Sequence, residues 1–348
     1  MTKLNSKGVH FMKLLVIGGT QFVGKSIVES ALKRNHEVTL FNRGKTNPEF
    51  FKETEKIIGD RENLDDLKKL KGQHWDAVID TCGYLPEIVK QSAEVLKDQV
   101  HLYAYISSMS VYKQLTDQDH LDESGEVSTL TDNELERATK GVKGRAANEY
   151  YGPLKFHSEM AVKEIMSESR SLIIRPGLIV GPDDPTDRFT YWPVRVEAGE
   201  AFIVPEPKDK KVQFIDVRDL SKWIVHMIEH QETGVFNTNG PREKLTMEGL
   251  IYSCQTVLNP ESRPVWAEES FLLKENVKPW IELPLWVPTQ GDFGIDCTKA
   301  IEKGLRFRPV EETIRDTYEW YRNHRGTLNH AGLNPEQEKV LLEKLRRS

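Results

Sequence analysis

Hydrophobic runs and helical patterns alternate through the first half of the chain. A buried strand is predicted at Lys13–Gly19, and further strands at Glu37–Asn42, Lys56–Gly59, Asp76–Thr81, His101–Ser107 and Ser171–Pro176. Helices are predicted at Phe22–Arg34, Asn63–Leu70 and Pro86–Lys97, and another opens around Gly152–Pro153, where proline suits the first helical turn. Strands that alternate with helices imply right-handed crossovers. The pattern therefore predicts an α/β fold with a doubly wound parallel sheet.

The alternation of strands and helices is interrupted in two places. Lys113–Asn148 is rich in polar residues and is predicted to be a long surface excursion, and after Gly181 proline-rich turns and tryptophans predict a smaller C-terminal lobe. Val212–Val217 is expected to return to the sheet region, and Gly304–Val310 with a helix to about His324 to form a final packing element. The resulting division is a disordered leader (1–11), a sheet domain (12–180, with 212–235 and about 295–322), a substrate-binding lobe (181–211 and 236–294) and a helical tail (323–348), which contains an amphipathic helix at Pro335–Arg347.

Composition narrows the classes of function. The 348 residues are 38% hydrophobic and carry a net charge of −6, so neither nucleic acid nor a membrane surface is expected as a partner. The three cysteines, Cys82, Cys254 and Cys297, lie far apart, which suits a reducing cytoplasm. No apolar run approaches 18 residues, and the leader lacks the hydrophobic region of a signal peptide. We expect a cytoplasmic protein, and the histidines lead us to expect no metal site.

A glycine turn follows the first predicted strand. Gly18, Gly19 and Gly24 precede or open a predicted helix, the context in which glycines let the backbone approach a pyrophosphate whose charge the helix N-terminus meets. We therefore predict a nicotinamide dinucleotide site over Gly18, Gly19, Thr20, Gln21, Phe22, Val23 and Gly24. Gln21 stands where a middle glycine is usual, and a plain strand–helix turn is the alternative.

The end of the second predicted strand bears on which dinucleotide binds. An acidic residue there would bond the ribose 2′-hydroxyl and indicate NAD, but the strand runs into Asn42 and Arg43. The planar guanidinium of Arg43 suits a 2′-phosphate and favours NADP over NAD, unless Arg43 is simply solvated. Further cofactor contacts are expected from Asp60, Arg61, Thr81, Cys82, Gly83, Ser107 and Pro176, although a small buried thiol is the favoured interpretation of Cys82.

Tyr151 and Lys155 form a candidate acid/base pair. A tyrosine with an ordinary pKa near 10 is a poor base at neutral pH. A lysine four residues later shares its helical face, and the positive charge favours the phenolate. Ser107 and Ser108 end the fifth predicted strand at the edge where open α/β sheets bind ligands, so a hydroxyl is available to hold a substrate oxygen. A core tyrosine with a surface lysine is the alternative for YGPLK alone.

Five segments carry a resemblance to a known family: GGTQFVG, ISSMSVY, YGPLK, RPGLIVGP and QFIDVRDL. Over residues 12–320 the chain resembles extended short-chain dehydrogenases/reductases of the NAD-dependent epimerase/dehydratase family. It is similar to bacterial isoflavone-reductase-like proteins, which share DPTDRFTYW, and to chloroplast stem-loop RNA-binding proteins. The resemblance implies a Rossmann-like domain, with Tyr151 as acid/base, Lys155 as its activator and Ser108 as the hydroxyl partner. It also allows a homodimer through helices beside the sheet.

Departures from the family pattern narrow the reaction. Dehydratases of the family carry an Asp-Glu pair where this chain has Met109 and Ser110, so water elimination by that route is not expected. The resemblance implies an NAD(P)-dependent oxidoreductase acting on a hydroxyl or carbonyl carbon of a small molecule. The alternatives are a nucleotide-sugar epimerase with tightly bound NAD and a non-catalytic RNA-binding or regulatory protein. Arg188, Tyr191 and Trp192 are candidate substrate contacts, unless their cluster only packs two lobes together.

Overall fold

A seven-stranded parallel sheet forms the centre of the protein. The computed structural model describes residues 11–115, 118–142, 149–288, 293–328 and 330–347. The sheet contains β1 (Lys13–Ile17), β2 (Glu37–Asn42), β3 (Glu55–Ile58), β4 (Trp75–Asp80), β5 (Val100–Ile106), β7 (Ser171–Pro176) and β11 (Gly234–Thr238). Its order is β11-β7-β5-β4-β1-β2-β3, so the strand order reverses beside β1. Such a reversal creates the crevice in which doubly wound folds bind ligands.

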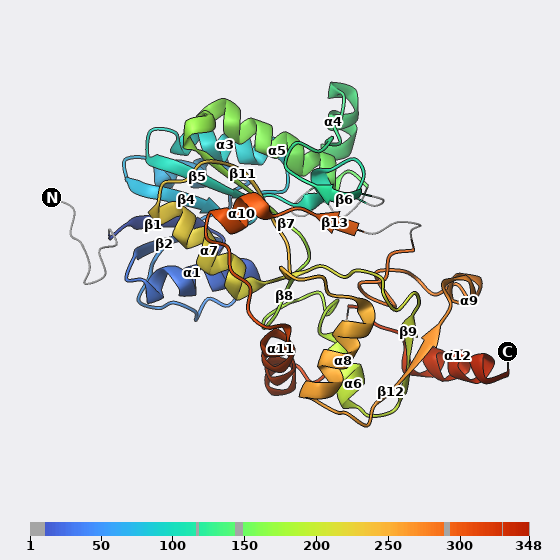
Figure 1. Ribbon diagram of the computed structural model, residues 1–348. Helices are drawn as coiled ribbons and strands as arrows, with labels where there is room; N and C mark the ends of the chain where they lie inside the picture. The colour runs from blue at the N-terminus through green and yellow to red at the C-terminus, as the bar shows by residue number, and fades with distance from the viewer. Residues whose placement is uncertain (1–10, 116–117, 143–148, 289–292, 329, 348) are drawn as a thin grey trace.

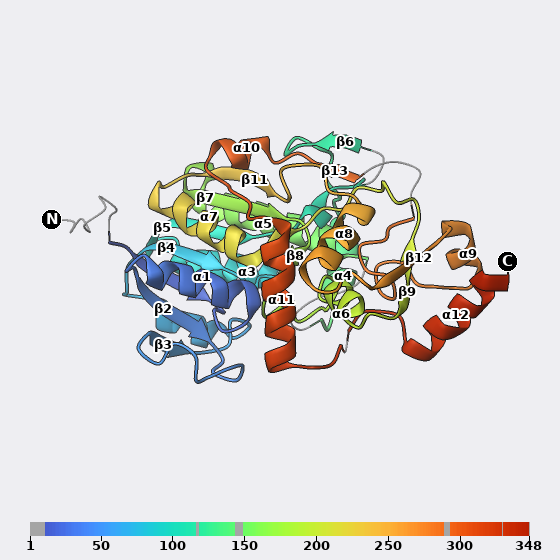
Figure 2. The same cartoon turned by 60° about the horizontal axis from the view of Figure 1, so that its bottom comes forward.

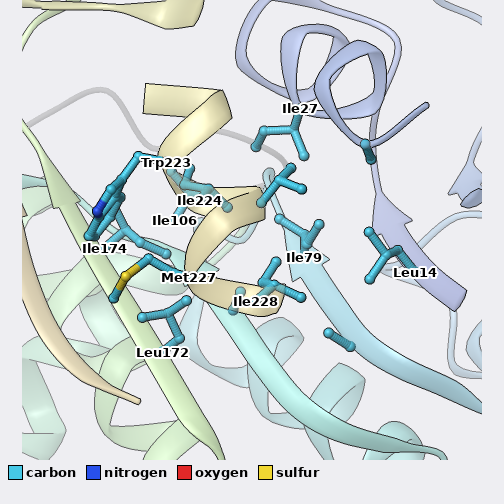
Figure 3. Close-up of a cluster of buried hydrophobic side chains, with 14 of the residues drawn as sticks. Leu14, Ile27, Ile79, Ile106, Leu172, Ile174, Trp223, Ile224, Met227 and Ile228 are labelled. Atoms are coloured by element: carbon cyan, nitrogen blue, oxygen red, sulfur yellow. The ribbon is translucent and has the colours of Figure 1, made fainter. Parts of the chain in front are cut away.

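Two helical layers cover the sheet because successive strand residues point to opposite faces. Leu14 and Val16 of β1 pack with α1 (Phe22–Lys33) and α7 (Val217–Glu229), whereas Leu15 and Ile17 pack on the other face. Figure 3 shows the first of these cores, with Ile27 of α1 facing Ile224 and Ile228 of α7. On the second face lie α2 (Leu64–Leu67), α3 (Pro86–Leu96) and α5 (Tyr151–Met166), as Figure 1 shows for α3 and α5.

A second lobe has its own core. It contains α6 (Tyr191–Glu197), β9 (Ala201–Pro205), α8 (Met247–Val257), β12 (Arg263–Ala267), α9 (Glu269–Lys274), α11 (Val310–His324) and α12 (Pro335–Arg347). Trp192, Phe202 and Leu250 are fully buried at its centre. The chain enters this lobe several times, so segments far apart in sequence lie side by side there (Figures 1 and 2).

Short elements connect the two parts. β8 (Ile179–Val180) pairs with β10 (Ile215–Asp216), and β6 (Gln118–Leu121) pairs with β13 (Phe293–Ile295). The remaining elements are α4 (Asp132–Thr139), α10 (Thr298–Glu302) and three short 3-10 turns: η1 (Lys68–Leu70), η2 (Met109–Val111) and η3 (Glu168–Arg170). No helix formed by the described residues is both long and apolar enough to cross a membrane.

The predicted fold class, a Rossmann-like doubly wound sheet with a smaller lobe, is confirmed. The second half differs in detail. Val212–Val217 supplies only β10, outside the main sheet, and the seventh strand is instead β11, which sequence analysis assigned partly to the lobe. After Gly304 a helix, α11, packs into the lobe rather than against the sheet.

Two other segments also differ from expectation or escape description. The predicted excursion at Lys113–Asn148 contains β6 and α4 among its described residues. Residues 1–10 of the predicted leader, 116–117 and 143–148 lie outside the described residues.

Candidate active site

A cavity of about 840 Å³ lies between the carboxyl ends of the sheet strands and the second lobe. The predicted cofactor and catalytic residues line it with one exception: Gly18, Gly19, Thr20, Gln21, Phe22, Val23, Gly24, Asn42, Arg43, Asp60, Arg61, Thr81, Cys82, Ser107, Ser108, Tyr151, Lys155 and Pro176. The exception is Gly83, whose carbonyl oxygen instead accepts hydrogen bonds from Lys155 and Tyr105. The structure therefore brings the two halves of the predicted site into one cavity.

The glycine turn packs so closely against its neighbours that a side chain would not fit at Gly18 or Gly24. Gly18 has a φ of +102°, and a Cβ there would lie 2.6 Å from Thr81 Oγ1. A Cβ on Gly24 would lie 2.8 Å from the backbone nitrogen of Gly19. Gln21, the N-cap of α1, makes no side-chain capping bond, and the first turn of α1 has no acidic residue. The positive end of α1 is thus left to meet an anion at the cavity, and these residues fit a pyrophosphate.

Two asparagines hold the turn in place. Asn42 at the end of β2 donates from Nδ2 to the Gly18 carbonyl at 2.9 Å and accepts from the Gly44 amide. Asn47 donates to the Thr20 carbonyl, also at 2.9 Å. The side chain of Asn42 is therefore committed to the turn itself. Arg43 beside it is exposed and makes no ion pair or hydrogen bond with the residues that the structure describes.

Arg61 is engaged by a neighbouring carboxylate. Its guanidinium donates to both Asp80 oxygens, at 2.5 and 2.8 Å, and to Ser92 Oγ at 3.0 Å. Tyr103 donates to the same carboxylate at 2.9 Å. Although burial alone would raise the pKa of Asp80, the Arg61 charge and its hydrogen bonds hold that pKa below its usual value. Arg61 lines the cavity as part of this fixed pair, with its planar group turned to Asp80.

Lys155 is buried beneath the cavity wall, with 2% of its surface exposed. Its Nζ donates to the carbonyl oxygens of Ile106 at 2.6 Å and Gly83 at 2.8 Å, and lies 4.3 Å from the centre of the Tyr105 ring. Burial lowers the pKa of Lys155 to about 7, against the opposing effect of the Asp80 carboxylate. Lys155 therefore carries a charge that is easily lost near neutral pH.

Tyr151 and Ser108 lie where α5 packs against η2. Tyr151 is the first residue of α5 and is half-buried in the cavity wall. Ser108 caps η2, because its Oγ accepts from the Ser110 amide at 3.1 Å. Gly152 follows Tyr151, and a Cβ there would lie 1.9 Å from the Ser110 carbonyl oxygen. Glycine at position 152 thus allows the two catalytic candidates to share one wall.

A buried polar chain supports this wall from behind. Ser107 Oγ donates to Glu159 Oε1 at 2.5 Å, and Arg175 donates to both oxygens of Glu159, at 3.0 and 2.7 Å. Arg175 also donates to the Tyr112 hydroxyl, which in turn donates to Asn237 at 2.6 Å. Glu159 was missed by sequence analysis, although it lies on α5 four residues after Lys155. The four-residue spacing, which places Glu159 on the same helical face as Lys155, is the signal that could have identified it.

The second lobe contributes three cations and a tryptophan to its side of the cavity. Arg188, Lys210 and Lys211 line it together with Trp280, and the Arg188 guanidinium lies 5.4 Å from the Trp280 ring centre. Asp184 is fully buried in the same wall. Its Oδ1 accepts from the amide and hydroxyl of Thr186, both at 2.8 Å, whereas Oδ2 has no partner, and burial raises the pKa of this carboxyl to about 6.

Tyr191 and Trp192 lie away from the cavity, which corrects their interpretation as substrate contacts. They are 1% and 0% exposed, at the start of α6 within the core of the lobe. Trp192 donates to the Pro284 carbonyl at 3.0 Å, and the Tyr191 ring packs against Gly332. Of the three predicted substrate residues, only Arg188 lines the cavity. Tyr191 and Trp192 begin α6, and both rings lie in the core of the lobe instead.

Metal-ligating side chains gather elsewhere. Within the described parts of the chain, one group of three comes together, and it consists of His226, Glu229 and His230 on α7. The expectation of no metal spacing overlooked that His226 and His230 are four residues apart.

The doubly wound sheet and the glycine turn are those of an NAD-dependent enzyme of the extended short-chain dehydrogenase/reductase type. Residues 14–238 match the NAD dependent epimerase/dehydratase family, and the chain belongs to that family. The expected enzyme class is thereby confirmed.

Similar proteins agree with this placement. Chloroplast stem-loop binding protein of 41 kDa b from Arabidopsis thaliana is 27% identical over 260 residues, which cover 70% of this chain and 62% of that protein, so the match spans less than two thirds of the relative. A putative dihydroflavonol 4-reductase from Synechocystis is 22% identical over 348 residues, covering 89% and 94% of the two chains. The structure of the Bordetella bronchiseptica enzyme WbmH in complex with NAD+ superposes with a TM-score of 0.68 at 16% identity, covering 90% of this chain and 99% of that one. This last likeness shows the shared fold.

Proposed function

We propose that the protein is an NAD(P)(H)-dependent oxidoreductase that acts on a hydroxyl or carbonyl carbon of a small anionic substrate. One observation carries the proposal: Ser108, Tyr151 and the buried Lys155 line the same cavity as the glycine turn. A dinucleotide in that turn and a substrate beside Tyr151 would therefore share one cavity. A shared cavity matters because fixed groups that surround the reacting oxygen can stabilise the charge that develops on it.

The chain's own residues divide the cofactor's binding between them. The Gly18–Gly24 turn and the N-terminus of α1 would hold the pyrophosphate, and Ser107 and Pro176 would border the nicotinamide end. When bound, the dinucleotide supplies or accepts the hydride. Arg43, exposed at the cavity, supports NADP over NAD, because no acidic side chain stands at the end of β2 to bond a ribose 2′-hydroxyl.

Tyr151 would exchange the proton at the substrate oxygen. In the reducing direction its hydroxyl donates to that oxygen, and in the oxidising direction its phenolate removes the proton. Lys155 in its charged form favours the phenolate, since the two residues lie one helical turn apart on α5. Ser108, at the cavity end of β5, would hold the same oxygen through its hydroxyl.

The lobe wall supports an anionic substrate that also carries a hydrogen-bond donor. Arg188, Lys210 and Lys211 bring positive charge to the end of the cavity formed by the lobe. A buried carboxyl oxygen without a partner costs free energy. Asp184 Oδ2 is such an oxygen in this wall, and a substrate hydroxyl or amine is a suitable donor for it.

Replacement of Tyr151 tests the proposal. We expect Tyr151→Phe to reduce NADPH consumption with a panel of small carbonyl compounds bearing phosphate or carboxylate groups by at least about 100-fold, the contribution typical of general acid–base catalysis. Binding of NADPH, measured by fluorescence titration, should stay within twofold of the unaltered protein. Tyr150→Phe is the matched control, because Tyr150 precedes α5 and does not line the cavity. Undiminished turnover in Tyr151→Phe would remove Tyr151 from the mechanism.

Nucleotide-sugar epimerisation is the second candidate. The arrangement of Trp280 with Arg188 and two lysines favours it, because an aromatic ring and cations suit a base and its phosphates. An epimerase re-reduces its own intermediate and retains its dinucleotide. Denaturing the purified protein and analysing the released material by mass spectrometry separates the candidates: stoichiometric dinucleotide supports epimerisation, and readily exchanged NADPH with net turnover supports reduction.

An RNA-binding role, the remaining alternative, is the least supported. The name of the Arabidopsis protein attributes stem-loop binding to that relative. The net charge of this chain is −6, and three of its cations, Arg188, Lys210 and Lys211, line the cavity. RNA binding that weakens steeply with salt, in protein without affinity for either dinucleotide, would overturn the enzymatic proposal.

A further inference from the structure

We propose that His226, Glu229 and His230, at the C-terminal end of α7, form a binding site for a divalent first-row transition-metal ion, with Zn²⁺ as the first candidate. Each side chain offers one ligand atom, and these atoms all lie within 4.8 Å of one another. His226 and His230 are separated by one helical turn, and their ring centres lie 4.1 Å apart. Two imidazoles and one carboxylate form a ligand set that zinc readily accepts, with water in the remaining position.

The nitrogen of His230 that is suited to a metal is defined by its other contact. Nδ1 of His230 lies 2.8 Å from the carbonyl oxygen of His226, which only accepts hydrogen bonds. Nδ1 therefore carries the proton, and in the neutral ring the lone pair is on Nε2. Metal-binding histidines commonly donate their second nitrogen to a carbonyl in this way, which fixes the tautomer and the ring orientation. His230 is exposed, so Nε2 is open to an incoming ion.

Glu229 is oriented by two residues from outside α7. One of its oxygens accepts from His36 Nε2 at 2.9 Å, and the other accepts from Arg34. His36 Nδ1 accepts from the Met12 amide at 3.3 Å, so the proton of this fully buried ring is on Nε2. Each carboxylate oxygen keeps a second lone pair, and hydrogen-bonded carboxylates of this kind are typical of metal sites.

Some charges around the cluster favour a bound cation, and one opposes it. The C-terminal end of a helix attracts cations, and Glu229 and Glu232 add negative charge. Arg34 opposes a second cation, but its charge is paired with Glu229. Lys303 is paired with Glu232 at 2.7 Å. Gly304 approaches His226 so closely that a Cβ there would lie 3.0 Å from Nε2, which leaves that side of the ring enclosed.

The location indicates a structural rather than a catalytic ion. His36 precedes β2 at the amino edge of the sheet, whereas Asn42, at the opposite end of the same strand, lines the cavity. Glu229 joins α7 to Arg34 and His36, which follow α1. An ion held by α7 would therefore rigidify the junction of α1, β2 and α7. The inference is independent of the proposed oxidoreductase activity.

Titration with Zn²⁺ tests the site. Isothermal calorimetry on the full chain, freed of any histidine tag, should show one saturable Zn²⁺ site that excess Mg²⁺ does not occupy. Replacing His226 or His230 with Ala should weaken that binding by more than about tenfold, because even loss of an outer partner of a metal ligand commonly costs 10–100-fold. Zn²⁺ should also raise the Tm of the unaltered protein and have less effect on the variants.

His324→Ala is the matched control. His324 ends α11, and its Nδ1 lies 3.0 Å from the Trp320 carbonyl, the same local arrangement as His230 but without a second imidazole one turn earlier. Zn²⁺ affinity should be unchanged in this variant. If His226→Ala fails to fold, the exposed His230 provides the decisive substitution. Absence of 1:1 Zn²⁺ binding, or equal affinity in His230→Ala and His324→Ala, would overturn the proposal.

Discussion

The carbonyl oxygen of Ser110 occupies the space that a side chain on Gly152 would need. A Cβ at position 152 would lie 1.9 Å from that oxygen, a distance at which the backbone must move. Gly152 follows Tyr151 at the start of α5, and Ser110 belongs to the turn that Ser108 caps. The contact therefore sets the spacing between the two catalytic candidates.

Gly152→Ala should consequently impair both stability and turnover. Overpacking of this kind costs about 1–3 kcal/mol of unfolding free energy, measured by urea denaturation. Turnover should fall with it, since α5 and η2 must separate. Gly249→Ala is the control: Gly249 lies in α8, and its nearest neighbour is the flexible side-chain end of Leu245, at 3.3 Å. Equal effects of the two substitutions would contradict the steric explanation.

The depressed pKa of Lys155 predicts a pH dependence of stability. Burial lowers this pKa to about 7, whereas the unfolded chain has the ordinary value near 10.4. Between these values the unfolded state binds more protons, so Lys155 makes the fold more stable as pH rises above about 7. We expect the stability difference between the unaltered protein and Lys155→Met to grow in favour of the unaltered protein, by at most about 1.4 kcal/mol per pH unit.

Urea denaturation from pH 6 to pH 9 measures this effect. Lys163→Met, on the same helix but only partly buried, is the control. Turnover of the unaltered protein should instead fall as pH rises above about 7, because Lys155 then loses the charge that supports the Tyr151 phenolate. Parallel stability profiles for the unaltered protein and Lys155→Met would rule out a titrating Lys155.

The buried Arg61–Asp80 pair is expected to be important for folding. Asp80 is fully buried and accepts from Arg61 and Tyr103. Asp80→Asn should destabilise the protein by about 3–5 kcal/mol, because it leaves a buried guanidinium without its counter-charge. Glu126→Gln breaks an exposed pair with Lys113 and should cost no more than about 1 kcal/mol. Chemical denaturation of both variants at pH 7 makes the comparison, and similar losses would count against the buried pair.

Asp184 should limit stability at neutral pH. Its pKa is raised to about 6, so the carboxyl stabilises the fold fully below about pH 4 and loses that contribution as pH rises through 6. Asp184→Asn keeps an acceptor for Thr186 and replaces the unpartnered charged oxygen. We expect it to be more stable than the unaltered protein by on the order of 1–2 kcal/mol at pH 7, with the gain absent at pH 4.

Thermal unfolding at the two pH values checks this expectation. The neighbouring Asp183 pairs with Lys25 at 2.5 Å, so Asp183→Asn should bring no gain at either pH. If Asp184 binds a substrate donor, the stabilised variant will also have a higher KM. A variant that is less stable than the unaltered protein at pH 7 would show that Asp184 has a stabilising partner.

Arg43 should discriminate between the dinucleotides. A charged hydrogen bond contributes about 1.5–3 kcal/mol, so Arg43→Ala should weaken NADPH by at least about tenfold and leave NADH nearly unchanged. Lys45→Ala removes another exposed cation from the same cavity and measures the general effect of charge. Fluorescence titration gives the affinities. Equal weakening of both dinucleotides by Arg43→Ala would contradict a 2′-phosphate contact.

The strands and helices of the sheet domain could be predicted because their patterns are strong and local. β2 and β7 have the predicted bounds, since each carries large apolar residues at its centre and is buried on both faces there. β11 was misplaced because its sequence, GVFNT, contains the polar Asn237 and Thr238, which the fold buries completely. No periodicity identifies a strand whose burial depends on tertiary hydrogen bonds.

The site was predictable where chemistry is encoded in spacing. The glycine turn and the Tyr151–Lys155 pair, both selected from their spacing, line the same cavity. Tyr191 and Trp192 illustrate the limit, because a ring near an arginine faces a ligand or a core depending on how its helix is rotated. Sequence analysis missed Asp80 and Glu159, because a carboxylate is buried only where other segments bring a cation to pair with it.

The lobe core has a consequence for synthesis of the protein. That core joins Phe189 and Trp192 to Ile314, Leu333 and Leu341, so residues near the end of the chain complete it. Glu338 of α12 accepts hydrogen bonds from Arg195 and the Ile203 amide. The lobe core therefore stays incomplete until α11 and α12 have been synthesised. Premature termination before α12 should yield a product for chaperones and proteases rather than a shortened enzyme.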